Sequence, residues 1–232
     1  YRLSWSSDGS LIADTTALSH VQTGIPPNTY VAVILEPYTA SGSAGASPPA
    51  ALRTLAAPAT TPAATAMSSH SAQLSWGANG NPAGTEYELS LSTDAFSAHF
   101  STPVAFGQGW VSTFTSLSSL DAGTTYYFRV RARNAENQRT DFSPTGSTQT
   151  LPGSVTPIPR TLGVSSASWS WSATGGPAVS SYEVRSATDG ALLSTVSTTS
   201  YTATGLLVNT AYGIRVAART GRTAFGPQRD GP

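Results

Sequence analysis

The sequence predicts an all-β protein made of three related units that repeat at roughly ninety residues, the first of them partial. Two observations carry this prediction. The segments that begin at Tyr1, Tyr87 and Tyr182 place apolar residues at alternate positions and end at an Asp, which is the period of a half-buried β-strand. Residues 61–87 and 156–182 also align without gaps, with a Trp, a Pro and a Tyr at the same spacing in both.

The elements of the second and third copies follow in order along the chain. A strand is expected at Trp76 and another at Trp171, because apolar and small polar residues alternate around both. Gly-Asn-Gly-Asn-Pro, with its proline at Pro82, and Thr-Gly-Gly-Pro, with its proline at Pro177, predict the turns into the next strands. A last strand is expected to begin at Phe142 in the second copy and at Phe225 in the third.

Each copy has a second signature further along the chain, just before another alternating segment. Leu120 and Tyr126 lead into alternating Phe128, Val130 and Ala132, and Leu206 and Tyr212 lead into Ile214, Val216 and Ala218. In the first copy the signature is expected to be one residue shorter, from Ile25 to Tyr30. That alignment turns Tyr30, Ala32 and Ile34 inward, and it turns Val31, Val33 and Leu35 outward.

These residues resemble the fibronectin type III family over nearly the whole chain. The family has a Trp on its second strand, a Tyr on its third and a Leu-to-Tyr corner before its sixth. The matching fold-defining residues are Trp76, Tyr87, Leu120 and Tyr126 in one unit and Trp171, Tyr182, Leu206 and Tyr212 in the next. The resemblance implies immunoglobulin-like sandwiches of two antiparallel sheets, with each corner tyrosine hydroxyl bonded to nearby backbone.

The resemblance also implies the domain boundaries. We expect a partial unit at residues 1–55 that lacks its first two strands, a complete unit at 56–151, and a unit at 152–232 that lacks most of its final strand. The connectors that start at Ala56 and Pro152 are rich in Pro, which predicts a semi-rigid string of units.

Composition narrows the classes of partner and chemistry. The net charge is zero and no basic stripe is present, so neither nucleic acid nor an anionic membrane is expected as a partner. No apolar run has the length of a membrane span. The chain has no Cys, and no cluster of metal ligands, nucleophile motif or phosphate loop stands out. We therefore expect no cofactor, no metal and no enzyme activity.

Two groups of residues stand out as candidate surfaces. Phe96, Phe100, Phe106 and Trp110 lie in the long segment of the second unit, where they form either a glycan or partner site or a satellite core. Arg129, Arg131 and Arg133 alternate with the core residues and are expected on a solvated sheet face, with Glu88 in reach. Asp8, Asp94 and Asp189 follow the third strands and are expected to be turn residues, not calcium ligands.

The first unit is the third candidate surface. With Val31, Val33 and Leu35 outward, both faces of its sixth strand are apolar, which favours a contact with another chain or shielding by the unit's own loop. The missing strands are supplied either by upstream residues or by another subunit through strand donation.

The sequence leaves two main functions open, and a third that it favours less. The first is a structural spacer in a long extracellular or cell-surface protein, of bacterial type, which assembles with itself or with neighbouring protein subunits, for example as a filament. The second is an adhesin or a carbohydrate-binding accessory array of a secreted enzyme, with the aromatic residues of the second unit on a glycan. An intracellular scaffold is a third, remote reading.

Overall fold

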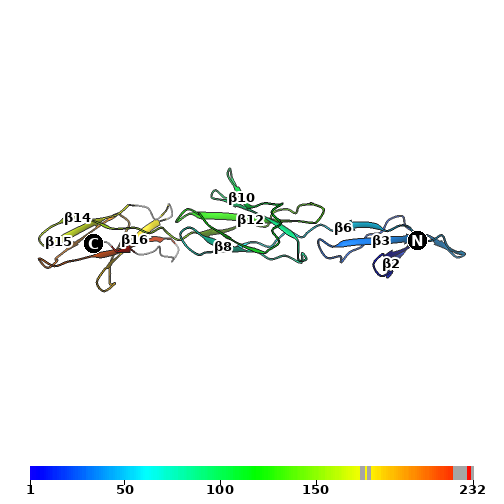
Figure 1. Cartoon of the computed structure of the whole chain (residues 1–232), viewed down its shortest axis with the longest axis horizontal. Coiled ribbons are helices and arrows are strands. Elements are labelled where there is room, and N and C mark those ends of the chain that lie inside the picture. Colours follow the sequence, from blue (N-terminus) through cyan, green and yellow to red (C-terminus); the bar gives the residue numbers. More distant parts are fainter. Residues whose placement is uncertain (173–175, 177–178, 222–228, 231–232) are drawn as a thin grey trace.

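Every regular element in the described part of the chain, residues 1–172, 176, 179–221 and 229–230, is a β-strand in this computed structural model. The strands form three groups, called units one, two and three, which follow one another along the long axis of the molecule (Figure 1). This confirms the predicted all-β fold. No helix among these residues could cross a membrane. Pro177 and Phe225, which we expected at a turn and at a last strand, lie outside the described residues.

Unit one contains a single four-stranded antiparallel sheet, in the order β2-β1-β3-β6. A short hairpin of β4 and β5 projects from it. The bounds are β1 Arg2–Trp5, β2 Leu11–Asp14, β3 Tyr30–Glu36, β4 Tyr38–Thr39, β5 Gly42–Ser43 and β6 Ala50–Arg53. Among the described residues no second sheet packs on this one, and none of the buried apolar clusters lies in unit one.

Unit two has the two sheets of a sandwich, in the orders β11-β8-β7 and β10-β9-β12-β13. Its strands are β7 Ala63–Ala66, β8 Ala72–Ser75, β9 Glu86–Ser92, β10 Ser101–Val104, β11 Phe114–Leu117, β12 Thr125–Arg133 and β13 Gly146–Gln149. The Trp76 ring meets the Tyr87 ring edge-on, with 5.8 Å between ring centroids. Leu74 of β8 is buried in one cluster with Leu89 of β9 and Val130 of β12, so the core joins the two sheets.

Unit three repeats this arrangement, in the orders β14-β15-β18 and β17-β16-β19-β20. Its strands are β14 Ile158–Leu162, β15 Ser166–Ser170, β16 Val179–Ser186, β17 Leu192–Val196, β18 Ser200–Thr204, β19 Ile214–Thr220 and β20 Arg229–Asp230. Trp171 meets Tyr182 edge-on at 5.5 Å between centroids. Leu206 packs on the core but is only partly buried, and Tyr212 is 38% exposed and not a core residue.

The two tyrosine corners make the expected backbone contact. The Tyr126 hydroxyl accepts a hydrogen bond from the Asp121 backbone N–H at 2.8 Å, and the Tyr212 hydroxyl accepts one from the Leu207 N–H at 3.1 Å. A shielded backbone donor without a partner is costly, so the Tyr126 hydroxyl stabilises its chain reversal more than the Tyr212 hydroxyl, whose bond is exposed.

The connectors between units are packed against the units that follow them. Ala56 and Ala59 belong to the core of unit two, and Val155 is fully buried in the core of unit three. The Asn81 side chain bonds the Ala57 backbone twice, accepting from its N–H at 2.7 Å and donating to its carbonyl at 2.8 Å. These contacts restrict the first connector further than its proline content alone would.

Candidate functional site

The most elaborate side-chain arrangement of the chain lies on the outer face of β12. Tyr126, Phe128, Val130 and Ala132 fill the inner face of this strand, so Arg129, Arg131 and Arg133 project from the outer one. We call these three residues the arginine ladder. The sequence predicts their direction correctly.

Phenylalanine rings cover the ladder. The Arg129 guanidinium lies between Phe96 and Phe142, at 4.1 and 4.0 Å from the ring centroids. Arg131 lies 4.6 Å from the Phe142 centroid and 5.5 Å from that of Phe106. Cations and rings therefore alternate along the strand, within the distance at which a guanidinium is attracted to a ring face.

The far end of the ladder adds a third arginine to the stack. Arg133 lies 4.8 Å from the Phe106 centroid. The interpretation of the three arginines as a solvated sheet face is thus wrong, since aromatic rings stack on their side chains. The Arg129 Nε is buried and has no hydrogen-bond partner among the described residues, so the ring faces are the main neighbours of that charge.

Two carboxylates on the neighbouring strand β9 neutralise part of the ladder. Arg131 pairs with Glu88 at 2.6 Å, and Glu88 is 8% exposed. Arg133 pairs with Glu86, and the hydrogen bond from its guanidinium lowers the pKa of the Glu86 carboxyl below its usual value. The predicted pairing of Glu88 holds, but it is half-buried and not the fully exposed pair that we expected.

The loop after β9 positions Phe96. Asp94 accepts hydrogen bonds from the Ser92 hydroxyl and from the Ala98 and His99 backbone N–H groups. The Ser92 hydroxyl is the main cause of the lowered pKa of Asp94. Phe96 has a φ of 66°, which is uncommon for a non-glycine residue and marks a conformation that surrounding contacts must hold. Asp94 is therefore a turn residue here, as the sequence indicates.

The remaining aromatic residues of this segment divide between two environments. Phe100 is 60% exposed, with its ring centroid 6.4 Å from that of Phe96. Trp110 packs on the main core, and its carbonyl accepts a hydrogen bond from the Tyr87 N–H at 2.9 Å. The structure thus brings Phe96, Phe100 and Phe106 to the ladder and separates Trp110 from them. Sequence reasoning missed Phe142, whose position at the start of an expected last strand gave no sign of a ring contact.

The strand register of unit one shows that the predicted inner and outer faces of its strand β3 are reversed. Leu3 pairs with Leu35 and Trp5 with Val33 in the β1–β3 register, and directly opposed residues of an antiparallel pair share one face. Leu3 and Trp5 correspond to Leu89 and Leu91 of unit two, which face the core. Val31, Val33 and Leu35 therefore lie on the inner face, and Tyr30 and Ile34 on the outer one, opposite to the prediction.

The prediction was wrong because it assumed a one-residue deletion in unit one, whereas the structure aligns units one and two without a gap. Asn28 and Gly123 both have a positive φ, 49° and 56°, and both precede the sixth strand by the same number of residues. Matching these two residues places Val31 at the position of the corner tyrosine Tyr126. A strand alternates its faces at every residue, so the supposed one-residue deletion reversed every assignment.

The inner face of unit one is apolar and partly open. Tyr1 is 39% exposed, Leu35 40% and Leu52 59%. A groove of about 390 Å³ runs between this face and the segment that follows β2, lined by Leu3, Val33 and Leu35 with Ala17 and His20. The loop covers the face only in part, since Leu18 and Val21 in that segment are 91% and 84% exposed.

Hydrogen bonds join unit one to unit two. Asn28 is 6% exposed and donates from its side chain to the Thr85 hydroxyl at 2.9 Å. Its side-chain oxygen accepts from the Ala135 N–H at 3.4 Å, and Asn134 donates to the Thr54 carbonyl at 3.3 Å. These residues are far apart in the sequence, and no sequence pattern predicts their contact.

The described part of the chain shows no cluster of metal-binding side chains. Within the described residues no three His, Asp or Glu side chains are placed to hold a metal ion. His20, His70 and His99 lie in exposed loops, and His70 and Leu120 share a hydrogen bond of 2.7 Å through the Leu120 carbonyl.

Comparison with known proteins agrees with this architecture. The family model of the fibronectin type III domain matches residues 56–149 and 157–229. A search of curated proteins found no match. A two-domain fibronectin type III segment of chicken tenascin is similar to this chain at 20% identity, covering 75% of this chain and 97% of that one with a TM-score of 0.48. The FN1–FN3 domains of chicken CNTN1 are similar at 19% identity, covering 99% and 88% with a TM-score of 0.36. The chain belongs to the fibronectin type III domain family.

Proposed function

We propose that this chain is a structural spacer segment of a long extracellular or cell-surface protein. Tandem fibronectin type III domains fit a spacer role in a larger protein, and such domains are generally non-catalytic. The observation that carries the proposal is the junction of units one and two, where the buried Asn28 bridges two elements of unit two. A junction with such contacts resists bending, because tilting one unit leaves buried polar groups without partners.

The junction gives the proposal a direct test. Because the chain has no Cys, spin labels can be attached at Leu11→Cys in unit one and Phe114→Cys in unit two, both at exposed positions. Pulsed electron paramagnetic resonance should give one narrow distance distribution, which broadens in the Asn28→Ala/Asn134→Ala double variant. Gln73→Ala, at an exposed strand position of unit two, is the matched control and should change nothing. A broad distance distribution in the parent chain would refute the proposal that the junction between units one and two is rigid.

Assembly is the finer part of the proposal. We place self-association at the inner face of unit one, which includes the predicted contact residues Val31, Val33 and Leu35. In units two and three a second sheet covers the equivalent face, and an uncovered sheet face of this kind is a typical association surface. Strands donated by another subunit would complete the sandwich.

Sedimentation velocity tests the assembly. The parent chain should form dimers or larger species as its concentration rises, and Val33→Asp should abolish them by placing a charge on the apolar face. Thr65→Asp, at an exposed position of β7, controls for added charge. A parent chain that stays monomeric at every concentration would count against assembly through this face.

The glycan alternative receives less support. Sugar recognition by stacking needs an open ring face, and the Phe96 and Phe106 rings already stack on arginines of the ladder. Phe100 retains exposed area, so glycan binding at this loop stays a prediction for glycan-array measurement, for which Phe100→Ala is the informative variant.

A further inference from the structure

The three units share one backbone feature at the corner before the sixth strand. We define corners one, two and three as residues 25–31, 120–126 and 206–212. Each has a residue of positive φ at its fourth position, Asn28 at 49°, Gly123 at 56° and Asn209 at 54°. Asn and Gly are the residues that adopt this conformation most readily, so the three corners share a left-handed residue at the same position.

Corner one is seated against unit two. Asn28 reaches the Thr85 hydroxyl and the Ala135 N–H, as described above. The preceding residue, Pro27, lies against Gly80, because a Cβ built on Gly80 would be 3.6 Å from the Pro27 Cγ. The surface that receives the corner is thus the loop between β8 and β9.

Corner two also lies against unit three, through its backbone. A Cβ built on Gly176 would lie 2.0 Å from the Ala122 carbonyl oxygen and 2.8 Å from the Gly123 Cα. Gly176 belongs to the loop between β15 and β16, which corresponds to the β8–β9 loop of unit two. In both junctions a corner therefore lies against a glycine of the next unit. A Cβ at Gly80 would make an ordinary van der Waals contact with Pro27, whereas Gly176 leaves no room for a Cβ beside Ala122.

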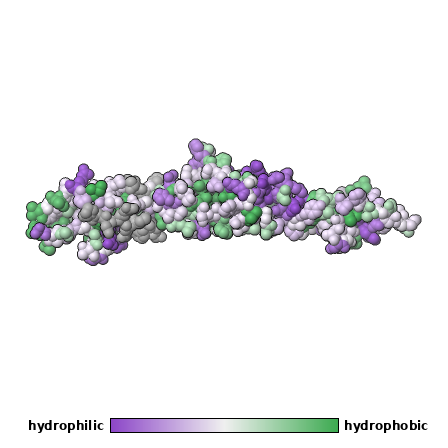
Figure 2. All heavy atoms as spheres, viewed as in Figure 1, coloured by the Kyte–Doolittle hydropathy of each residue, from purple (hydrophilic) through white to green (hydrophobic). Residues whose placement is uncertain are grey.

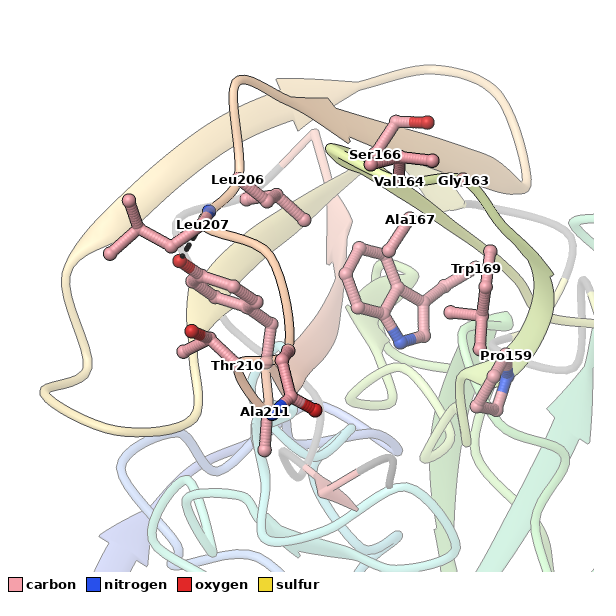
Figure 3. Close-up of a pocket in the computed structure, with 13 residues that line it drawn as sticks. Pro159, Gly163, Val164, Ser166, Ala167, Trp169, Leu206, Leu207, Thr210 and Ala211 are labelled. Carbon is pink, nitrogen blue, oxygen red and sulfur yellow. Dashed lines mark hydrogen bonds between the residues drawn. The ribbon is translucent and has the colours of Figure 1, made fainter.

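Corner three has the same left-handed residue, but its surface is exposed to solvent. Leu207 is 72% exposed and Val208 64%, and Asn209 is also exposed. Val208 stands where Pro27 and Ala122 stand in the seated corners. Figure 3 shows Leu206 and Leu207 on one side of a cavity of about 560 Å³ and Trp169 and Pro159 on the other. The end of unit three that carries this corner also shows apolar residues on its surface (Figure 2).

We propose that corner three docks a further fibronectin type III unit arranged in tandem, in the geometry that corners one and two use. Val208 would contact a loop glycine of that unit. The Asn209 side chain would donate to a hydroxyl placed as the Thr85 hydroxyl is and accept from a loop N–H placed as that of Ala135 is. Continuity with two occupied junctions supports this occupant.

A second copy of the chain fits the surface less well. The β8–β9 loop and Gly176 both lie against corners of their own chain, and these are the places that a corner contacts. The proposal extends the spacer function, on which it rests, by naming the surface and the chemistry of the next junction.

The test uses the whole chain with a fourth unit added. A second copy of residues 56–151, which contains the Gly80, Thr85 and Ala135 positions, is fused after Pro232 through a short Gly–Ser spacer. Hydrogen–deuterium exchange of residues 206–212 is compared between the fusion and the 232-residue chain. Docking should slow exchange in corner three by roughly fivefold or more, as a newly formed hydrogen-bonded contact does.

Two variants of the fusion separate docking from general effects. Val208→Asp should return the exchange of corner three to the rate of the unfused chain, whereas Thr202→Asp, at an exposed position of β18, should not. Corner one serves as an internal reference in every sample. If corner one is protected and corner three gains no protection on fusion, the inference is overturned and the spacer function stands. If both corners exchange freely, the spacer function fails as well.

Discussion

The ring of Phe142 should stabilise the arginine ladder through cation–π contacts, and replacing Phe142 gives the most specific test of these contacts. Phe142 lies 4.0 Å from the Arg129 guanidinium and 4.6 Å from that of Arg131. A cation–π contact contributes about 0.5–1 kcal/mol at an exposed site and more when water is excluded. Phe142→Leu keeps most of the apolar volume and loses both contacts, so unit two should lose about 1–2 kcal/mol.

Native-state hydrogen exchange of the β9 and β12 amides measures this loss, because it reports the opening free energy of unit two separately from its neighbours. A double-mutant cycle with Arg129→Met, which keeps the apolar stem and removes the charge, isolates the pairwise term. We expect a coupling of about 0.5–1 kcal/mol. Phe114→Leu, at a ring that is 56% exposed, should cost less than about 0.5 kcal/mol. A Phe142–Arg129 coupling below about 0.3 kcal/mol would refute the stacking argument.

Three further predictions concern the core, the corners and pH. Trp76→Ala should cost unit two about 3–5 kcal/mol in chemical denaturation, while the opening free energy of unit three stays unchanged. Tyr126→Phe should cost about 1 kcal/mol by the same measurement, and Tyr212→Phe less, since Tyr212 is 38% exposed and water replaces its hydroxyl bond. The lowered pKa of Glu86 contributes stability that is present above its ordinary value of 4.5 and is lost as pH falls through the folded-state pKa. In an acid titration followed by circular dichroism, Glu86→Gln should therefore flatten the loss of stability below pH 4.5, and an unchanged profile would contradict the ion pair with Arg133.

Local patterns predicted the cores of units two and three well. Trp76, Tyr87 and Val130 are buried as the alternation of their strands indicates, because a strand must turn every second residue to one face. The same rule failed at Tyr30 and Val31, where one assumed deletion reversed the faces of the strand. The Asn-Thr pair at Asn28, which recurs at Asn209, is the sequence signal that would have fixed the alignment.

By itself the sequence determined the all-β class, the repeated strand order, the inner faces of two units and the outward direction of the arginine ladder, since each follows from spacing along one strand. Only the tertiary structure decided that Phe142 covers the ladder, that Val31 faces inward and that Asn28 meets Thr85, 57 residues away. Those contacts depend on strand register and on how loops return to the sheet, and such choices are settled by the free energy of packing between segments distant in the chain.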